Sequence, residues 1–509
     1  MSIVIGVDVG TSGTKAVAIN AKGEVVASAL IEYPLHTPKP GWAEQDPADW
    51  ERAAFEALSQ LAARLGSHAA EVKGIGLTGQ MHGSVFLDSG DNVIRPALLW
   101  CDQRTAKQCD DITARVGEPR LIEMVCNPAL TGFTAPKILW LRDNEPANYA
   151  KVRKVLLPKD YVRLRLTGEY ASDVADSSGT LLFDVKNRIW HKELLGLLDI
   201  PAEWMPRAFE GTEITGTLTP EAAKKTGLPA GIPVVAGGGD QAAGGVGCGI
   251  VDTGVISATV GTSGVVFAFA DEVSLDPQGR VHTFCHSVPG KWHVMGVVLS
   301  AGGSLRWFRD ALCNEEIQKG KAEGRDPYEY ITGDADAIAP GSEGLLFLPY
   351  LSGERTPHKD PYAKGAFIGL SLKHTKAHMA RAVLEGVSYA MRDSLEIMRD
   401  MGVAITQVRA SGGGAKSAMW RQMQADVNET PLVTINVDEG PAYGAALLAT
   451  VATGMYGSVP EACAATIRVV DSCEPDAARS AVYTRWFREY QAAYKALAPG
   501  FKRGAELLG

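Results

Sequence analysis

The chain has 509 residues, a mass of 54.1 kDa and a formal net charge of −9, with 46% hydrophobic and 21% charged residues. This length predicts two or three domains, each large enough to bury a core. The acidic balance excludes a protein with a basic nucleic-acid groove, and no apolar run approaches the roughly 18 residues of a membrane helix.

The eight cysteines are scattered along the chain and contain no Cys-x-x-Cys pair. This usage favours reduced thiols over disulfides or a zinc site. Strand-like residues begin at Ile3, without a charged, apolar leader. We therefore expect a cytoplasmic α/β protein without nucleic-acid or membrane partners.

The first stretch, residues 3–20, predicts two β-strands joined by a Gly/Thr/Ser turn. Such a turn directs backbone N–H groups outward beside hydroxyls, which is a cradle for an anion such as phosphate. A carboxylate in the apolar strand before it needs a cation or a polar site. A plain hairpin with one satisfied aspartate is the alternative. The residues concerned are Asp8, Gly10, Thr11, Ser12, Gly13 and Lys15.

The next elements predict alternating strands and helices. A third strand covers residues 24–33, and a helix follows with Asp46 as N-cap and Pro47 at its first position. A short apolar strand covers residues 72–78. Helical patterns dominate residues 105–166, and a Pro/Gly-rich connection covers residues 200–233.

Two polar clusters follow early strands, where open α/β sheets place their ligands. The first is Gln80, Met81 and His82, which suits a polyhydroxylated molecule with one apolar edge. The second contains Trp100 and Asp102, followed by Arg104. A lone histidine is more often structural, but the position of His82 after a strand and beside glycine favours a site.

Residues 233–241 predict a strand that ends in three glycines, followed by Asp240 and Gln241 at the start of a small-residue helix. The helix N-terminus stabilises Asp240 as an anion, and a carboxylate held there can take a proton from a substrate hydroxyl. A simple N-cap is the alternative role.

Two nucleotide-binding motifs partly match the glycine-rich segments. Gly237, Gly239 and Ala242 fit the dinucleotide pattern GxGxxA, but the acid expected about 20 residues later is missing from residues 255–260. A P-loop is excluded because Ala415 precedes Lys416 where that motif requires glycine.

The Gly-Thr-Ser-Gly turn occurs a second time at Gly261, Thr262 and Ser263, 251 residues (261 − 10) after the first copy. The two copies open the two halves of the chain. This predicts two similar domains that face each other across one nucleotide. Thr259 stands where the first copy has Asp8, so the halves share a scaffold but not a catalytic role.

The second half continues with a long amphipathic helix over residues 377–398 and a strand at residues 408–411. Gly412, Gly413, Gly414 and Lys416 follow at a strand-to-helix turn, where backbone can approach a flat or anionic ligand. A strand over 431–436 and a small-residue helix over 440–451 come next. From Tyr456 onward we expect only helices and polar loops.

These pieces together resemble the FGGY carbohydrate kinases, relatives of the actin, hexokinase and Hsp70 ATPases. The matching motifs span nearly the whole chain, and within the family they are most similar to the bacterial xylulokinases. They lie at residues 79–83, 132–141, 156–161, 347–358 and 365–385.

The resemblance implies two actin-like (ribonuclease H-like) ATPase domains, residues 1–247 and 248–509, with a nucleotide and sugar cleft between them. It implies Asp240 as catalytic base and Asp8 as a second catalytic acid, both near Mg²⁺, which keeps much of its water. Sugar contacts would be Gln80, Met81, His82, Trp100, Asp102, Asp240 and Gln241. Phosphate and adenosine contacts would be Gly10, Thr11, Ser12, Lys15, Gly261, Thr262, Ser263, Gly413, Gly414 and Lys416.

The implied reaction is phosphorylation of D-xylulose by MgATP, with the sugar and ATP as partners and a homodimer left open. One departure is that xylulokinases commonly have asparagine after the base, where this chain has Gln241, as glycerol kinases do. Alternatives are a kinase of another ketose or polyol, such as ribulose or glycerol, and a non-catalytic, actin-like ATP-binding clamp.

Overall fold

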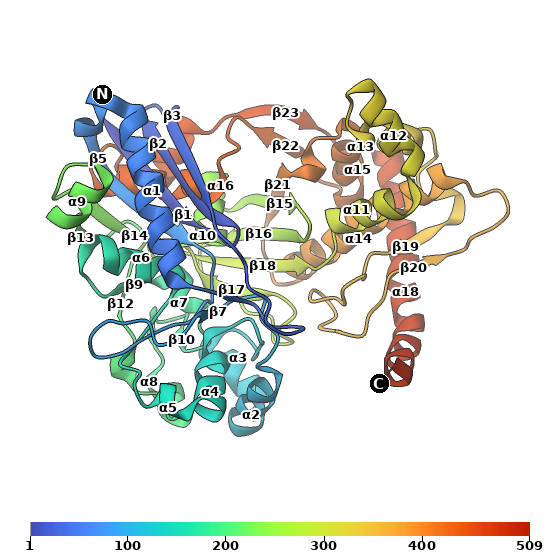
Figure 1. Ribbon diagram of the computed structural model, residues 1–509. Coiled ribbons are helices and arrows are strands. Elements are labelled where there is room, and N and C mark those ends of the chain that lie inside the picture. Colours follow the sequence, from blue (N-terminus) through green and yellow to red (C-terminus); the bar gives the residue numbers. More distant parts are fainter. Residues whose placement is uncertain (1, 509) are drawn as a thin grey trace. The chain divides into compact units, whose positions relative to one another are not determined.

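The computed structural model describes residues 2–508, and the chain divides into two compact units. The first unit runs to Asp252 and adds Phe269–His293 and Val437–Arg468. The second unit contains Thr253–Ala268, Val294–Asn436 and the chain from Val469 onward. Each unit combines a mixed β-sheet with helices, which confirms the predicted α/β class (Figure 1).

The first unit is built on a six-stranded sheet with the order β13-β14-β5-β1-β2-β3. The predicted hairpin is present, because β1 pairs antiparallel with β2 and places Asp8 opposite Lys15. β5 runs parallel to both β1 and β14, so three neighbouring strands end at the same edge. The bounds are β1 Ile3–Val9, β2 Gly13–Asn20, β3 Val25–Glu32, β5 Val72–Gly79, β13 Ile214–Thr217 and β14 Pro233–Gly239.

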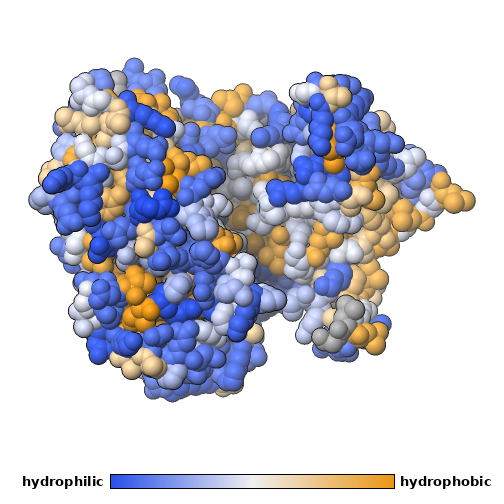
Figure 2. All heavy atoms as spheres, in the orientation of Figure 1, coloured by the Kyte–Doolittle hydropathy of each residue, from blue (hydrophilic) through white to orange (hydrophobic). Residues whose placement is uncertain are grey.

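Helix α1 (Pro47–Leu65) begins as predicted, since the Asp46 side chain accepts from the Ala48 N–H and Pro47 occupies the first turn. Its apolar side, including the fully buried Trp50, packs on β2 and β3. Its outer side is hydrophilic, with Arg52 paired to Glu56 (Figure 2).

Helix α16 (Gly440–Ala452) packs on β1 and β5, although it is far from both in sequence. The approach is close enough that a Cβ built on Gly6 would lie 1.8 Å from the Ala442 carbonyl oxygen. The small residues predicted at 440–451 therefore serve helix-on-sheet packing. Helix α10 (Asp240–Gly247) contacts α16 in the same way, through small residues.

The first unit contains further helices and short strands outside this sheet. Its helices are α2 Ala106–Val116, α3 Glu118–Val125, α4 Thr134–Asn144, α5 Pro146–Tyr149, α6 Pro158–Thr167, α7 Val174–Ser178, α8 Lys192–Leu197, α9 Pro220–Thr226 and α17 Val459–Thr466. Its short strands are β4 Glu44–Gln45, β6 Val85–Leu87, β7 Ala97–Leu98, β8 Lys154–Leu156, β9 Ala171–Asp173, β10 Phe183–Asp184, β11 Ile189–Trp190, β12 Arg207–Phe209 and β17 His282–Cys285.

The second unit contains strands that neighbour one another in the order β16-β15-β21-β22-β23 within a seven-stranded sheet. β15 repeats the role of β1, pairing antiparallel with β16 and parallel with β21. The strands are β15 Gly254–Val260, β16 Gly264–Ala270, β18 Trp292–Val298, β19 Leu346–Leu348, β20 Ala366–Ile368, β21 Ile405–Gly412, β22 Leu432–Ile435 and β23 Val469–Cys473.

The predicted amphipathic helix of this unit is α14 (Lys376–Asp400), most of whose residues are buried. The other helices are α11 Gly302–Leu312, α12 Asn314–Glu323, α13 Pro327–Asp336, α15 Ala418–Asn428 and α18 Ala477–Leu508. Within residues 2–508 we find no helix with the length and apolarity needed to cross a bilayer.

The tail differs from the prediction of helices and polar loops only. β23 pairs antiparallel with β22 and joins Leu432 to Cys473 across the ladder. As the last strand in the sheet order, β23 exposes about half of Val469 and Val470, so its five residues lack the buried alternation that marks a central strand. That missing periodicity is why the sequence did not reveal it.

Candidate active site

Two carboxylates lie at the carboxyl edge of the first sheet. Asp8 is near the end of β1, and Asp240 is the first residue of α10, directly after β14. β5 lies between these strands, with Thr78 in register with both Asp8 and Gly238. Two predicted catalytic acids, 232 positions apart (240 − 8), are therefore brought to one edge by parallel strand pairing.

Both acids hold their protons more tightly than ordinary aspartates. Burial raises the pKa of Asp8 to about 7, with a further rise from the Asp240 carboxylate that Lys15 partly offsets. Burial raises the pKa of Asp240 to about 6, while hydrogen bonds from the Gln241 side chain and backbone oppose the rise. A base with a pKa near 6 is well suited to accept a proton at neutral pH.

The donor set fits a Mg²⁺ ion. Oδ1 of Asp8 is buried and has no hydrogen-bond partner among the described residues, so it is available to a cation or its water. Mg²⁺ takes one or two carboxylates and fills its other positions with water and phosphate oxygens. Within residues 2–508 no group of three or more metal-ligating side chains gathers.

The first two carbonyl groups of the first Gly-Thr-Ser-Gly turn are bound by neighbouring side chains. The Gly10 carbonyl accepts from the Tyr33 hydroxyl (2.5 Å) and Gln80 Nε2 (3.2 Å), and the Thr11 carbonyl accepts from Gln45 Nε2 (2.7 Å). A trans peptide points its N–H opposite to its C=O. The N–H groups of Thr11 and Ser12 therefore face away from these partners, as a phosphate cradle requires.

Lys15 follows this turn and is half-buried. Its Nζ lies 2.5 Å from Oε2 of Glu439, the residue before α16. The predicted phosphate contact is thus held by a carboxylate that the sequence places more than 400 positions away. Lys15 also lowers the pKa of Asp8, so its charge acts directly on that acid.

Met81 and His82 lie in the turn after β5, beside the turn that carries Asp240. A Cβ built on Gly239 would lie 2.7 Å from Met81 Cγ, so the Met81 side chain contacts the backbone just before Asp240. The His82 ring packs edge-on against Phe133 (centroids 4.9 Å apart), and its Nδ1 lies 2.7 Å from the Gly179 carbonyl oxygen. His82 has φ 67°, a left-handed backbone that its surroundings must hold.

Lys137 holds that backbone. Its Nζ donates to the carbonyls of His82 (2.8 Å) and Gly132 (2.6 Å). Burial lowers the pKa of Lys137 to about 7, an effect that the nearby Asp102 carboxylate opposes. Lys137, which lies in the family-like motif at residues 132–141, therefore holds the backbone of the His82 turn in place.

Two predicted sugar contacts, Gln80 and Asp102, make hydrogen bonds to other residues of the protein through their polar atoms. Gln80 accepts from the Thr11 hydroxyl (3.3 Å) and donates to Gln45 Oε1 (2.9 Å). Asp102 is fully buried and binds the Arg104 guanidinium through both oxygens, with a further bond from the Ala43 N–H (2.6 Å). Their geometry shapes the loops around the site.

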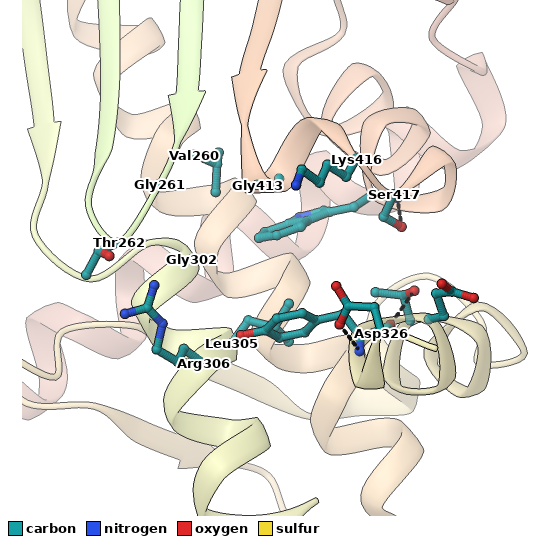
Figure 3. A pocket seen from close by; sticks show the side chains of 15 residues that line it. Val260, Gly261, Thr262, Gly302, Leu305, Arg306, Asp326, Gly413, Lys416 and Ser417 are labelled. Atoms are coloured by element: carbon teal, nitrogen blue, oxygen red, sulfur yellow. Dashed lines mark hydrogen bonds between the residues drawn. The ribbon is translucent and has the colours of Figure 1, made fainter. Parts of the chain in front are cut away.

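The second unit contains a pocket of about 460 Å³. Predicted residues Gly261, Thr262, Gly413, Gly414 and Lys416 line it, whereas Ser263 belongs to the same turn but does not line the pocket. Figure 3 shows Lys416 and Ser417 on one side and Leu305, Arg306 and Asp326 on the other. The aromatic side chains of Tyr328 and Trp420 also line it, so the pocket offers rings as well as polar groups.

The second turn has its carbonyls bound by backbone. The Gly261 carbonyl accepts from the Gly302 N–H (2.8 Å), and the Thr262 carbonyl accepts from the N–H groups of Ala301 and Gly303 (3.0 and 2.9 Å). The N–H groups of Thr262 and Ser263 therefore point away from the start of α11, by the same peptide geometry as in the first turn. In place of an acid, Thr259 bonds through its hydroxyl to Ser411 (2.7 Å).

Sequence reasoning missed Arg306, Tyr328 and Lys137. Arg306 and Tyr328 approach the pocket from α11 and α13, helices without a glycine-rich signature. Figure 3 shows the Arg306 guanidinium pointing toward the turn at Thr262. Lys137 lies inside a quoted motif, and its position in a run of apolar residues was the one usable signal.

Comparison with known proteins identifies the family. The family model for the FGGY family of carbohydrate kinases matches residues 3–247 with its N-terminal domain and residues 256–453 with its C-terminal domain. The chain belongs to the FGGY family of carbohydrate kinases. This confirms the predicted family and its two-domain, actin-like fold.

Among FGGY kinases, the chain is similar to the xylulose kinase of Escherichia coli (strain K12), with 43% identity over 97% of this chain and 99% of that protein. A solved xylulose kinase from Rhodospirillum rubrum matches with a TM-score of 0.92 and 32% identity, covering 98% of this chain and all of that chain. The Bacillus subtilis (strain 168) gluconokinase is 33% identical over 90% of this chain and 89% of that protein. The prediction of a xylulokinase-type carbohydrate kinase is thus confirmed.

Proposed function

We propose that this FGGY kinase transfers the γ-phosphoryl group of ATP to the 5-hydroxyl of D-xylulose, forming D-xylulose 5-phosphate and ADP. The observation that carries the proposal is Asp240, a carboxylate with a pKa of about 6 at the start of α10, next to Met81. The full-length similarity to xylulose kinases supports the choice of sugar.

In the proposed reaction, Asp240 accepts the proton of the sugar hydroxyl as the new oxygen–phosphorus bond forms and the bond to the ADP oxygen breaks. Phosphoryl transfer needs little covalent chemistry from the protein, so positioning and charge stabilisation supply most of the acceleration. The outward N–H groups of both turns and Lys15 would hold the phosphates. Asp8 and Asp240 would hold Mg²⁺ through its water, and the ion would neutralise phosphate charge.

We propose that the sugar is contacted by Met81, His82, Trp100, Asp240 and Gln241. Gln80 and Asp102 would shape the loops of the protein around the sugar. The pocket lined by Gly413, Gly414, Lys416, Tyr328 and Trp420 would take adenosine. The domain limits 1–247 and 248–509, and the cleft expected between the domains, stay predictions.

Gluconate is the second candidate, because a gluconokinase is among the relatives. Its carboxylate needs a cation, and the cations near the sugar residues are already engaged. Arg104 binds Asp102 and Glu44 (both 2.7 Å), and Lys137 binds two backbone carbonyls. A neutral ketose therefore fits this cluster better than an aldonate.

The deciding experiment is an ADP-release assay with D-xylulose, D-ribulose, glycerol and gluconate, each with and without Mg²⁺. We expect sugar-dependent ADP release with the highest kcat/KM for D-xylulose. Asp240→Asn should lower kcat by roughly 10²-fold or more, because it keeps the shape but removes the base. A rate of ADP release that does not change with any of the sugars would instead indicate an ATP-dependent clamp.

A further inference from the structure

The strand that carries Asp240 is interrupted just before it. β14 pairs with β5 at Val235, and pairing resumes only at Gly238, with a register shift between them. Gly237 has φ 74°, and a Cβ there would lie 1.7 Å from the Leu77 carbonyl oxygen. Such a bulge re-aims the chain after it, which here is the turn that presents the base.

One side chain bonds two backbone carbonyls of the bulged segment. Arg163 of α6 donates from Nη1 to the Val235 carbonyl (2.8 Å) and from Nη2 to the Ala236 carbonyl (2.6 Å). Nη1 also donates to the Thr215 hydroxyl of β13 (2.5 Å). The planar guanidinium thus fixes the two carbonyls at a set spacing, as a flexible ammonium does not.

Arg163 is itself held in a buried ionic cluster, made of Lys159, Asp160, Arg163, Asp173 and Asp176, all with side chains that are fully buried. Lys159 Nζ lies 2.7 Å from Asp160 and 2.6 Å from Asp173. Burying five ionisable groups is costly unless they are paired. No step of the phosphoryl transfer uses them, so the cluster needs another explanation.

We infer that Arg163, anchored by this cluster, is a positioning residue that holds the β14 bulge in the shape that places the Asp240 carboxylate against the sugar hydroxyl. The inference rests on the proposed role of Asp240 as base. A misplacement of about 1 Å at a reacting group can cost roughly 10²-fold in rate, so a rigid bulge has a direct catalytic consequence.

A double-mutant cycle tests the inference with four proteins: wild type, Arg163→Lys, Asp240→Asn and the double variant. Lysine keeps the charge that pairs with Asp160, but it is shorter and lacks the planar pair of donors that holds the two carbonyls at a fixed spacing. If Arg163 acts through Asp240, Arg163→Lys lowers kcat by roughly 10- to 100-fold in the wild type and by less than about twofold in the Asp240→Asn background. An equal loss in both backgrounds, or no loss in the first, overturns the inference.

The single variant Asp240→Asn distinguishes a failure of the proposed base from a failure of the positioning role of Arg163. Near-normal turnover in that protein alone overturns Asp240 as base, and the inference falls with it. A large loss there, together with equal effects of Arg163→Lys in both backgrounds, leaves the base standing and overturns only the positioning role.

A matched control removes a guanidinium from another buried ion pair. Arg381 bonds Glu385 (2.9 Å) and Tyr483 (2.6 Å) in the second unit, so Arg381→Lys should lower thermal stability while kcat stays within about twofold. Where Arg163→Lys does not fold, Thr215→Val removes the hydroxyl bonded to Arg163 and keeps the charges. We then expect about a threefold loss of kcat that disappears with Asp240→Asn, and an equal loss in both backgrounds would overturn the inference.

Discussion

The indole N–H of Trp100 donates a hydrogen bond to the hydroxyl of Thr11 at 3.0 Å. The same hydroxyl donates to Gln80 Oε1 (3.3 Å), whose amide holds the Gly10 carbonyl. Trp100, a predicted sugar contact, is therefore hydrogen-bonded to the turn that is predicted to bind phosphate. Trp100 is still 41% exposed, so its ring remains free to meet a ligand.

Thr11→Val tests this connection, because valine keeps the shape but removes the hydroxyl. Losing one hydrogen bond of about 1 kcal/mol should raise the KM for the sugar by roughly fivefold. Steady-state kinetics at saturating ATP measure the change. Thr14→Val is the matched control, since the Thr14 hydroxyl bonds the Tyr33 hydroxyl in the same hairpin and not Trp100. An unchanged KM would show that the Trp100 ring does not depend on the bond.

Asp8→Asn should stabilise the protein at high pH. The folded-state pKa of about 7 lies above the ordinary value of 3.8, so the protonated form stabilises the fold at low pH, and this contribution is lost as pH rises through 7. Asparagine stays neutral throughout. We expect the variant to be more stable by about 4 kcal/mol at pH 8 and equal to wild type below about pH 4, measured by urea unfolding.

The same Asp8→Asn protein tests the metal role. If Asp8 holds Mg²⁺ through water, the half-saturating Mg²⁺ concentration should rise by roughly tenfold and kcat should fall. D-xylulose binding without nucleotide should persist. A Mg²⁺ titration that superimposes on wild type would assign Asp8 a structural role.

Gln241→Ala should move the acid limb of the pH profile upward. The Gln241 side chain donates to Asp240 Oδ1 (3.4 Å) and lowers the pKa of that carboxyl, so its loss raises the pKa above 6. The base works only when deprotonated, and activity is therefore lost at a higher pH as the medium is acidified. Profiles of kcat/KM between pH 5 and 8 measure the shift, and a limb that stays or moves downward contradicts the expectation.

D-xylulose should exceed glycerol by orders of magnitude in kcat/KM. A site built to bond hydroxyls rejects a shorter analogue strongly, because its own polar groups are then left unpaired. His82→Ala should erode this preference and leave the KM for ATP within about twofold. His68→Ala, which removes an exposed histidine paired with Glu71, is the control. Better turnover of glycerol would show that the sugar is wrongly assigned while the kinase activity stands.

Arg306→Ala should weaken ATP binding. Arg306 lines the pocket of the second unit and its guanidinium points toward the turn at Thr262 (Figure 3). Removing one cation near a phosphate should raise the Kd for ATP by roughly 10-fold, with sugar affinity unchanged. Isothermal titration measures both constants. Lys373→Ala removes a positive charge from the same unit at a surface ion pair and should have no effect.

The sequence alone determined the elements whose signals are local. Asp46 and Pro47 specify the start of α1 through backbone capping, and the repeated Gly-Thr-Ser-Gly turn specifies two hairpins. The three glycines before Asp240 specify a strand that turns into a helix. Each depends on dihedral angles and hydrogen bonds within a few residues, so the residues themselves carry the information.

Only the tertiary structure decided which polar side chains bond other residues of the protein. Gln80 and Asp102 have the residue types of sugar contacts, yet their partners Gln45 and Arg104 occupy their polar atoms. The edge strand β23 is likewise defined by its pairing with β22, not by a pattern of its own.

Arg163 shows the physical reason most clearly. It lies 77 residues (240 − 163) before Asp240, and it bonds the strand that leads to this proposed base. Nothing in the residues next to Arg163 predicts which two carbonyls it bonds. A polar side chain can bond any complementary group, and burial raises the cost of leaving it unpaired without saying which partner it finds. That choice is made when helices and strands distant in sequence pack together.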